Sequence, residues 1–335
     1  MSGAGERICI VGAGRMGEGM AAAFLHAGLP VTLIDFKARE PQLRQAYFNQ
    51  VRVHVCDELQ MLVSLEVIEP AQVDAAMARL RVCGREGAVE DLVTTRWVFE
   101  AVPEVMEAKA ECFAWLGEQC RSDAVIASTT STFLVTELAQ LLPGPGRFLN
   151  AHWLNPALLM PLVEVSRSAD TDESVVQELM QLLRDVGKVA VQCGPAAGYI
   201  VPRIQALAMN EAARMVEEGV ASAEDIDTAI RVGFGLRFSV LGLLEFIDWG
   251  GGDILHFASQ YLATAIHPRF AAPAVIQQNM AAGRNGLRDG QGFYDYSEQD
   301  VPAYRLQRLR ELKSRLQLMA LLPAAGCATG RSTIT

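Results

Sequence analysis

His152 and Glu164 are two residues of complementary chemistry that lie twelve positions apart. His152 follows the apolar run RFLNA, and Glu164 lies in the apolar segment MPLVEVS. An imidazole exchanges a proton near neutral pH, whereas a carboxylate among apolar neighbours needs a partner because burying it alone is costly. A hydrogen bond between them would satisfy both groups, fix the imidazole tautomer and stabilise its protonated form. The alternative is a histidine that only completes a hydrogen bond in the core.

Hydroxyl and charged side chains follow two further apolar runs. Residues 128–132 are five consecutive Ser and Thr residues. Such side chains commonly cap the next helix, although one of them could donate a hydrogen bond to a substrate oxygen. Glu104 and Lys109 could approach a bound ribose or form an ordinary charged pair near a helix start. The spacing leaves these alternatives open.

A glycine motif, VGAGRMG, stands between an apolar run and an Ala- and Met-rich segment. The run Ile8–Val11 predicts a buried strand, and the segment after Gly17 predicts a helix. Gly12 permits a tight turn, Gly14 lets the backbone approach a pyrophosphate, and Gly17 lets the helix pack against the strand. With Arg15 and Met16 between the glycines, the helix N-terminus would face the phosphates. The alternative is a glycine turn in an ordinary α/β domain.

Asp35 ends a second apolar run, VTLID, eighteen residues after Gly17. An acid at this place accepts hydrogen bonds from a ribose 2′-OH and repels a 2′-phosphate. The sequence therefore favours NAD over NADP, although Lys37 and Arg39 lie nearby. A nicotinamide cofactor implies hydride transfer, for which the protein must supply a proton acceptor or donor. Of the five histidines, His152 is the best placed, because strand ends in such a sheet face the cofactor cleft.

Composition narrows the range of partners and compartments. The chain has 335 residues, half of them apolar and a fifth charged, which is typical of a globular enzyme of about two domains. A net charge of −10 argues against nucleic acid or an anionic membrane as partner. We expect no signal peptide before the first strand near Arg7, no transmembrane segment and no metal site. The seven cysteines form no CxxC pair, so reduced thiols in the cytoplasm fit better than disulfides.

Alternating strands and helices predict a Rossmann-type, doubly wound and mostly parallel sheet. Helical periodicity marks 105–120 and 172–187, and 41–80 reads as a helical insertion without a clear strand. Beyond the first two strands, five more are expected at 97–102, 124–127, 148–151, 162–165 and 189–192.

From about Ile204 onwards the chain reads as entirely helical. Ser222 and Asp225 form a capping pattern, and a last helix is expected at 304–322 with leucines on one face and five basic residues in solvent. The predicted domains are 1–193, which binds NAD, and 194–322, which is helical; 323–335 is expected to be a disordered tail. Apolar residues in the helical half exceed what a small domain needs, which predicts a homodimer.

Six segments together resemble the L-3-hydroxyacyl-CoA dehydrogenase family. They are VGAGRMG, EAVPEVMEAK, STTST, HWLNPALLMPLVEV, GYIVPR and GRNGLRDGQGFYDY, and the similarity extends from Ile8 to about Tyr296. Ser131, His152 and Glu164 are spaced as in that family. The resemblance implies a nucleotide-binding domain followed by a helical domain that dimerises.

The resemblance also implies a role for each site residue. His152 would be the general base that removes the 3-hydroxyl proton while hydride leaves for the nicotinamide, and Glu164 would orient it. Ser131 would bond the reacting oxygen, and Asn155 would shape the site beside His152. Asp35 would hold the adenosine ribose, and Glu104 and Lys109 would lie near the nicotinamide ribose.

The sequence departs from the family pattern at two places. Pro202 in GYIVPR replaces an Asn that helps hold the substrate oxygen in the family, and Asn210 could supply that contact instead. Arg237 in GFGLRFSVLG replaces a proline-containing stretch and resembles relatives that oxidise free hydroxy acids, such as carnitine and gulonate dehydrogenases. A guanidinium can bind a carboxylate through two hydrogen bonds, or it can form a surface or interface ion pair.

Three functions follow from the resemblance. The first is oxidation of a short-chain L-3-hydroxyacyl-CoA, favoured by the 41–80 insertion, which corresponds to a CoA-contacting arm in the family. The second is the same chemistry on a small free 3-hydroxy acid or related alcohol, favoured by Pro202 and Arg237. The third is a non-catalytic protein like the lens crystallins that arose from this family; the retained Ser131, His152 and Glu164 count against it.

Overall fold

The computed structural model describes residues 6–322 and divides into two compact units after Met209. The division falls within helix α8 (Val201–Glu217), so the first turns of this helix belong to the first unit. The domain boundary at 193/194 stays a prediction. The predicted tail at 323–335 lies outside the described residues. Each unit is described below by itself.

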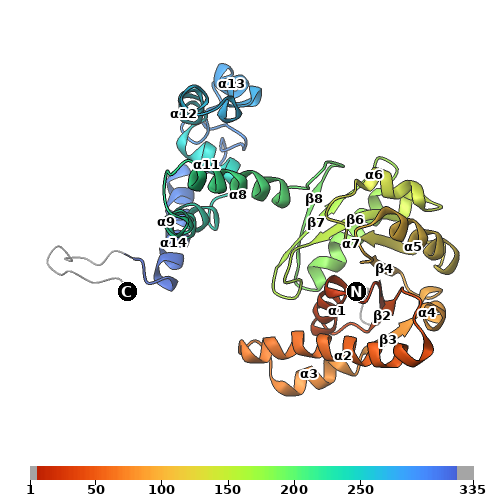
Figure 1. Ribbon diagram of the computed structural model, residues 1–335. Helices are drawn as coiled ribbons and strands as arrows, with labels where there is room; N and C mark the ends of the chain where they lie inside the picture. The colour runs from red at the N-terminus through yellow and green to blue at the C-terminus, as the bar shows by residue number, and fades with distance from the viewer. Residues whose placement is uncertain (1–5, 323–335) are drawn as a thin grey trace. The chain divides into compact units, whose positions relative to one another are not determined.

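The first unit is built on a single sheet of eight strands (Figure 1). The strands are β1 (Ile8–Val11), β2 (Val31–Asp35), β3 (Leu80–Gly84), β4 (Trp97–Glu100), β5 (Val125–Ser128), β6 (Phe148–Trp153), β7 (Leu162–Ser166) and β8 (Val189–Cys193). They lie in the order β3-β2-β1-β4-β5-β6-β7-β8, and every neighbouring pair is parallel except β6 and β7. The predicted Rossmann-type, mostly parallel sheet is therefore confirmed.

Helices cover both faces of this sheet. They are α1 (Arg15–His26), α2 (Pro41–Ser64), α3 (Pro70–Met77), α4 (Arg85–Leu92), α5 (Met106–Gln119), α6 (Val135–Leu138) and α7 (Glu173–Asp185), with short 3₁₀ turns at Ala139–Leu141 and Pro145–Arg147. Successive strand residues point to opposite faces: Ile8 and Ile10 pack in the core under α1, α2, α3 and α7, while Cys9 and Val11 pack in the core under α4, α5 and α6. Both cores are apolar, which explains why the strands read as near-continuous apolar runs.

The helical insertion at 41–80 is present as α2 and α3, but the sequence analysis missed the strand β3 that follows it. β3 lies at one edge of the sheet, and Arg81 and Val82 are only partly buried. Arg81 forms an ion pair with Asp91. A half-exposed edge strand can carry polar residues where a central strand carries an apolar run. Because strands were predicted from apolar runs, β3 was not recognised.

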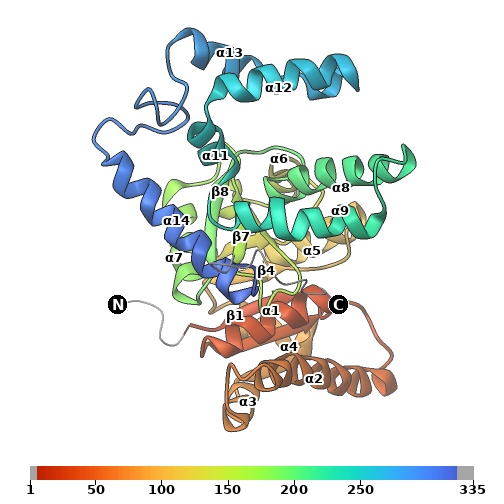
Figure 2. The ribbon, with the colours of Figure 1, turned by 90° about the vertical axis from the view of Figure 1, so that its left-hand side faces the viewer.

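The second unit is helical, as predicted (Figures 1 and 2). After α8 come α9 (Ala223–Ala229), a π-helical turn (Ile230–Gly235), α10 (Leu236–Phe238), α11 (Leu243–Gly250), α12 (Gly252–Ala265), a 3₁₀ turn (Pro268–Phe270), α13 (Ala274–Ala281) and α14 (Val301–Leu318). The predicted cap of α9 is confirmed, because Ser222 Oγ accepts a hydrogen bond from the Asp225 N–H at 3.1 Å. Isolated β-bridges join Gln291 to Gly286 and Asp295.

The last helix, expected at 304–322, begins and ends earlier. Asp300 caps it by accepting the Ala303 N–H at 3.0 Å, and Pro302 fits the first turn, where its missing N–H has no helical partner in any case. Leu306 and Leu309 on this helix are about half exposed.

Among the described residues, six cysteines carry free thiols, and Cys9 is buried as expected. Burial raises the pKa of the Cys9 thiol well above its ordinary value. No helix within residues 6–322 is long and apolar enough to cross a membrane.

Candidate active site

The glycine turn after β1 has the geometry that its spacing predicts. Gly12 has a positive φ of 116°, and a Cβ there would come within 2.3 Å of the Ala101 carbonyl oxygen. A Cβ on Gly17 would lie 1.9 Å from the Gly12 carbonyl oxygen, so α1 packs tightly against the turn. Nothing lies within 4 Å of the position of a Cβ on Gly14. The backbone at Gly12 is thus packed against Ala101, whereas the space next to Gly14 is empty. A pyrophosphate can approach the N-terminus of α1 through this space.

A cleft of about 790 Å³ opens at the carboxyl ends of the parallel strands. Its lining comes from the ends of β1, β2, β4 and β5, which converge at the crevice between β1 and β4 where the strand order reverses. The lining includes Gly12, Gly14, Arg15, Met16, Asp35, Arg39, Tyr47, Glu104 and Ser131. The open space before Gly14 and this lining fit a dinucleotide.

Asp35 lies in the cleft at the end of β2, already paired with a cation. Its carboxylate accepts a hydrogen bond from Arg39 Nε at 2.5 Å. The Arg39 guanidinium also stacks 3.4 Å from the centre of the Tyr47 ring, and the Tyr47 hydroxyl donates to the Ala13 carbonyl at 2.7 Å. These contacts fix Arg39 against Asp35 and tie α2 to the glycine turn.

His152 and Glu164 are brought together by the pairing of β6 with β7. The two residues are direct partners in the one antiparallel ladder of the sheet, so their side chains lie on the same face. His152 Nδ1 lies 3.0 Å from Glu164 Oε2, and both residues are buried, His152 to 7% exposure and Glu164 completely. Trp153 points to the opposite face and packs in the core with Phe24. Burial of this indole helps to fix the direction of the preceding imidazole.

Glu164 has further partners at the start of α8. Its Oε1 accepts hydrogen bonds from the Ile200 N–H at 2.9 Å and the Val201 N–H at 2.8 Å. These N–H groups lie at the helix N-terminus, where a negative charge is favoured. Since Oε1 is occupied by two donors, Oε2 is the acceptor for His152. We assign the proton to Nδ1 of His152 on this basis, which leaves Nε2 with a free lone pair.

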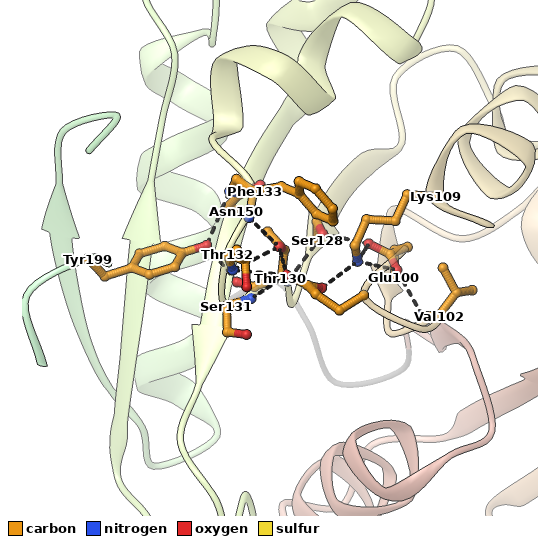
Figure 3. Close-up of polar contacts among 11 residues, drawn as sticks. Glu100, Val102, Lys109, Ser128, Thr130, Ser131, Thr132, Phe133, Asn150 and Tyr199 are labelled. Atoms are coloured by element: carbon orange, nitrogen blue, oxygen red, sulfur yellow. Dashed lines mark hydrogen bonds and ion pairs between the residues drawn. The ribbon is translucent and has the colours of Figure 1, made fainter. Parts of the chain in front are cut away.

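A buried ion-pair network lies behind the cleft (Figure 3). Lys109 is 1% exposed, and its Nζ donates to both oxygens of Glu100, at 3.0 and 3.1 Å, and lies 3.2 Å from Glu104 Oε2. Ser128 Oγ donates to Glu100 at 2.5 Å, and the Val102 N–H donates to Glu100 at 2.8 Å. Burial raises the pKa of Glu100 despite the nearby Lys109 charge and these hydrogen bonds. Lys109 therefore contacts Glu104 from behind, while Glu104 itself lines the cleft.

Glu104 in turn organises the hydroxyl-rich turn after β5. It accepts hydrogen bonds from the Thr130 hydroxyl, from the Ser131 N–H at 3.2 Å and from the Thr132 N–H at 2.9 Å. Burial acts to raise the pKa of Glu104, but the Thr130 hydrogen bond and the Lys109 charge outweigh it, so the pKa lies below its ordinary value. Most hydroxyls here thus serve the turn. Ser131 is exposed at the cleft, and its hydroxyl has no hydrogen-bond partner within the described part of the chain.

The other residues expected at the site take no part in the hydrogen bonds described above. Asn155 is exposed, three residues beyond His152, and precedes a cis peptide bond to Pro156. Pro202 is the second residue of α8, where a missing N–H is tolerated. Asn210 and Arg237 belong to the second unit, and both are exposed. The Arg237 guanidinium lies over the Phe246 ring at 4.7 Å.

Sequence reasoning missed Glu100, Asn150 and Tyr199, which connect the expected residues. The signal for Glu100 was present, because a carboxylate inside the apolar run WVFE needs a cation nearby. Tyr199 and Asn150 carried no local signal: the hydroxyl of Tyr199 accepts a hydrogen bond from Asn150 Nδ2 at 3.1 Å, across 49 residues of chain. No group of side chains within residues 6–322 has the arrangement of a metal site.

Comparison with known proteins identifies the chain's relatives. The family model for the NAD-binding domain of 3-hydroxyacyl-CoA dehydrogenase matches residues 7–196, and the model for the C-terminal domain of the same enzyme matches residues 198–296. The chain belongs to the 3-hydroxyacyl-CoA dehydrogenase family. It is accordingly an NAD-dependent oxidoreductase, and the cofactor predicted from the glycine motif and Asp35 is confirmed at the level of the family.

Named members of the family resemble the chain over most of its length. A 3-hydroxybutyryl-CoA dehydrogenase of Mycobacterium tuberculosis is 32% identical over 88% of this chain and 100% of its own. A 5-formyl-3-hydroxy-2-methylpyridine 4-carboxylate 5-dehydrogenase of Mesorhizobium japonicum is 28% identical over 92% of this chain and 96% of its own. The crystal structure of a 3-hydroxyacyl-CoA dehydrogenase from Archaeoglobus fulgidus is similar with a TM-score of 0.73 at 29% identity, covering 94% of this chain and 99% of that one.

The pairing of Asp35 with Arg39 predicts how the cofactor preference changes when the acid is removed. In Asp35→Ala, the freed Arg39 guanidinium and the nearby Lys37 can attract a 2′-phosphate, and a ribose 2′-OH would lack the acceptor that we expect Asp35 to provide. We expect weaker NAD binding and a shift of preference towards NADPH by at least about tenfold, which corresponds to one ionic hydrogen bond of ~1.4 kcal/mol or more. Fluorescence titration of the protein with each cofactor gives the two dissociation constants, and their ratio gives the preference. Unchanged NAD affinity and preference would contradict the assignment of Asp35 to the ribose.

The lowered pKa of Glu104 predicts a pH-dependent contribution to stability. A carboxylate with a depressed pKa stabilises the folded state above its ordinary pKa, near 4.5, and this contribution is lost as pH falls through the lower folded value. Without cofactor, we expect Glu104→Gln to lower the free energy of unfolding in urea by about 1–2 kcal/mol at pH 7, near the lower end for charged hydrogen bonds because Glu104 is partly exposed. The difference from the parent should begin to shrink as pH falls below about 4.5 and should be lost below the lower folded pKa of Glu104.

Glu107→Gln, an exposed site in the first turn of α5, three residues after Glu104, is the control. It should change stability little at any pH. A Glu104→Gln deficit that stays constant down to pH 3 would show that the ionised carboxylate does not hold the turn.

Proposed function

We propose that this family member oxidises the 3-hydroxyl of a short-chain L-3-hydroxyacyl-CoA to the 3-keto form with NAD, and that His152 is the general base. The observation that carries the proposal is the hydrogen bond of His152 Nδ1 to a buried carboxylate, which leaves Nε2 as a proton acceptor. Relatives over nearly the whole chain carry the name 3-hydroxybutyryl-CoA dehydrogenase.

The cofactor is held by the glycine turn and the strand ends around it. Gly12, Gly14 and Gly17 would shape the phosphate site, with Arg15 and Met16 at the start of α1, and Asp35 would accept a hydrogen bond from the adenosine ribose. Glu104 would bind the nicotinamide ribose, and the ion pair with Lys109 would hold Glu104 in place. Bound NAD supplies the acceptor for the hydride that leaves C3.

The protein residues manage the proton and the oxygen. His152 Nε2 takes the hydroxyl proton as the C3–H bond breaks, so that the carbonyl forms without a high-energy alkoxide. Glu164 stabilises the resulting imidazolium, and its charge is anchored by the N-terminus of α8. The free hydroxyl of Ser131 donates to the reacting oxygen, and Asn155 shapes the loop beside His152.

The helices after β2 favour a CoA substrate. α2 has 24 residues, and with α3 it forms the insertion that, by the resemblance to the family, corresponds to an arm that contacts CoA. Exposed apolar side chains on the helical unit, including Phe257, Tyr261 and Leu306, support a homodimer formed through that unit. The free thiols are compatible with a cytoplasmic location.

A second candidate substrate is a small free hydroxy acid. Arg237 is exposed and, within residues 6–322, has no carboxylate in ion-pair range; its contact is the Phe246 ring. A relative at 28% identity is named for a pyridine carboxylate rather than for a CoA ester. Pro202 removes one contact that acyl-CoA members of the family offer the substrate oxygen, and Asn210 is the candidate to replace it.

Substitution of His152 tests the chemistry. We expect His152→Ala to lower kcat by at least about a hundredfold, because a general base contributes a factor of 10² to 10⁴. NAD affinity should be unchanged, since His152 does not line the cofactor cleft. The control is His26→Ala, at the exposed end of α1, which should retain activity. A near-normal kcat in His152→Ala would refute the role.

A substrate panel separates the candidates. NADH production is measured with 3-hydroxybutyryl-CoA, free 3-hydroxybutyrate and carnitine, in the parent and in Arg237→Ala. We expect turnover of the CoA ester with a KM that Arg237→Ala leaves unchanged. Turnover of free acids alone, with a KM that Arg237→Ala raises and Arg231→Ala does not, would favour the second candidate. No turnover of any compound by a protein that binds NAD would contradict both.

A further inference from the structure

The segment that leads into α8 contacts both the His152–Glu164 pair and the turn that carries Ser131. Tyr199 is its central residue, with a positive φ of 44° and an exposure of 7%. A positive φ is uncommon for a bulky residue and indicates that the surroundings hold the backbone in place. Three separate sets of contacts fix this residue.

The aromatic ring of Tyr199 lies flat against the imidazole of His152. The ring centres are 4.7 Å apart, and the planes differ by 12°. Glu164 restrains His152 at Nδ1 only, which leaves the ring free to rock about that hydrogen bond. The stacked phenol removes this freedom, and its negative face attracts a positive charge that develops on the imidazole.

The hydroxyl of Tyr199 joins two elements of the site (Figure 3). It donates to the Thr130 carbonyl at 2.6 Å and accepts from Asn150 Nδ2 at 3.1 Å. Asn150 also donates to the Phe133 carbonyl at 3.1 Å, so both ends of the turn around Ser131 are tied to β6. Burial raises the pKa of the Tyr199 hydroxyl well above its ordinary value, which keeps it protonated as a donor.

The backbone after Tyr199 completes the arrangement. The next two N–H groups, of Ile200 and Val201, are the donors to Glu164 Oε1. A shift of Tyr199 would therefore move the imidazole, the carboxylate that orients it and the turn that presents the Ser131 hydroxyl.

We propose that Tyr199 is a positioning residue that fixes the proton acceptor at His152 and the hydroxyl donor at Ser131 in one frame. The inference rests on the proposed function for the roles of those two residues. The ring acts on His152 and the hydroxyl acts on the Ser131 turn. A phenylalanine keeps the first action and loses the second, and a leucine loses both.

The test compares Tyr199→Phe with Tyr199→Leu. We expect kcat with 3-hydroxybutyryl-CoA to fall about five- to tenfold in Tyr199→Phe and about a hundredfold in Tyr199→Leu, since a misplacement near 1 Å can cost that much. The Kd of NAD should be unchanged in both, because Tyr199 does not line the cofactor cleft. A kcat within twofold of the parent in Tyr199→Leu would overturn the proposal.

A second readout does not depend on turnover. In the NMR spectrum of histidine-labelled protein, the ring-proton resonances of His152, assigned by their absence in His152→Asn, should lie upfield because of the stacked ring. They should stay upfield in Tyr199→Phe and move downfield in Tyr199→Leu. If Tyr199 only stabilised the fold, folded Tyr199→Leu that binds NAD normally would keep the parental kcat.

The two readouts separate failure of this inference from failure of the proposed function. A parent that turns over no substrate in the panel, yet shows the predicted shift in Tyr199→Leu, would refute the function and retain the stacking. An active parent whose His152 resonances and kcat are insensitive to Tyr199→Leu would refute the positioning role alone.

Discussion

The site depends on a single buried carboxylate. Glu164 is completely inaccessible, and an ion in that position is unfavourable unless each of its oxygens is satisfied. The fold meets this requirement with the N-terminus of α8 at one oxygen and the imidazole of His152 at the other. The same contacts that make the charge tolerable fix the tautomer of His152, which is the base in the proposed function, and the point at which the chain leaves the sheet. Stability and chemistry are linked through this one side chain.

The reversal of strand direction at β7 makes this arrangement possible. β1, β2, β4, β5 and β6 are parallel, so their carboxyl ends deliver the glycine turn, Asp35, Glu104, Ser131 and His152 to one edge of the sheet. If β7 were parallel to these strands, its first residues would lie at the opposite edge of the sheet, beside the amino ends of the other strands. Because β7 is antiparallel, its first residues start beside the end of β6, and Glu164 becomes the direct partner of His152. Tyr199 then connects this pair to the neighbouring strand end.

Much of this was predictable because the chemistry is local in sequence. The glycine spacing requires a particular turn, and the central strands are apolar runs, since both faces of the sheet are covered. The His152–Glu164 pair could be inferred, because a carboxylate in an apolar segment needs a partner. β3 could not be predicted from its pattern, since an edge strand tolerates Arg81. Tyr199 and Asn150 could not be identified, because their contacts join residues far apart in the chain and depend on a register that the sequence does not encode locally.

The substrate is least determined by the sequence, since Pro202 and Arg237 favour a free hydroxy acid and the α2–α3 insertion favours a CoA ester.

The most direct test of the account is a crystal structure of the protein with NADH and acetoacetyl-CoA. The account predicts that Nε2 of His152 lies within hydrogen-bond distance, about 2.6–3.2 Å, of the 3-keto oxygen, while Nδ1 remains bonded to Glu164. A 3-keto oxygen bound by other groups, with Nε2 of His152 turned away from both substrate and nicotinamide, would contradict it.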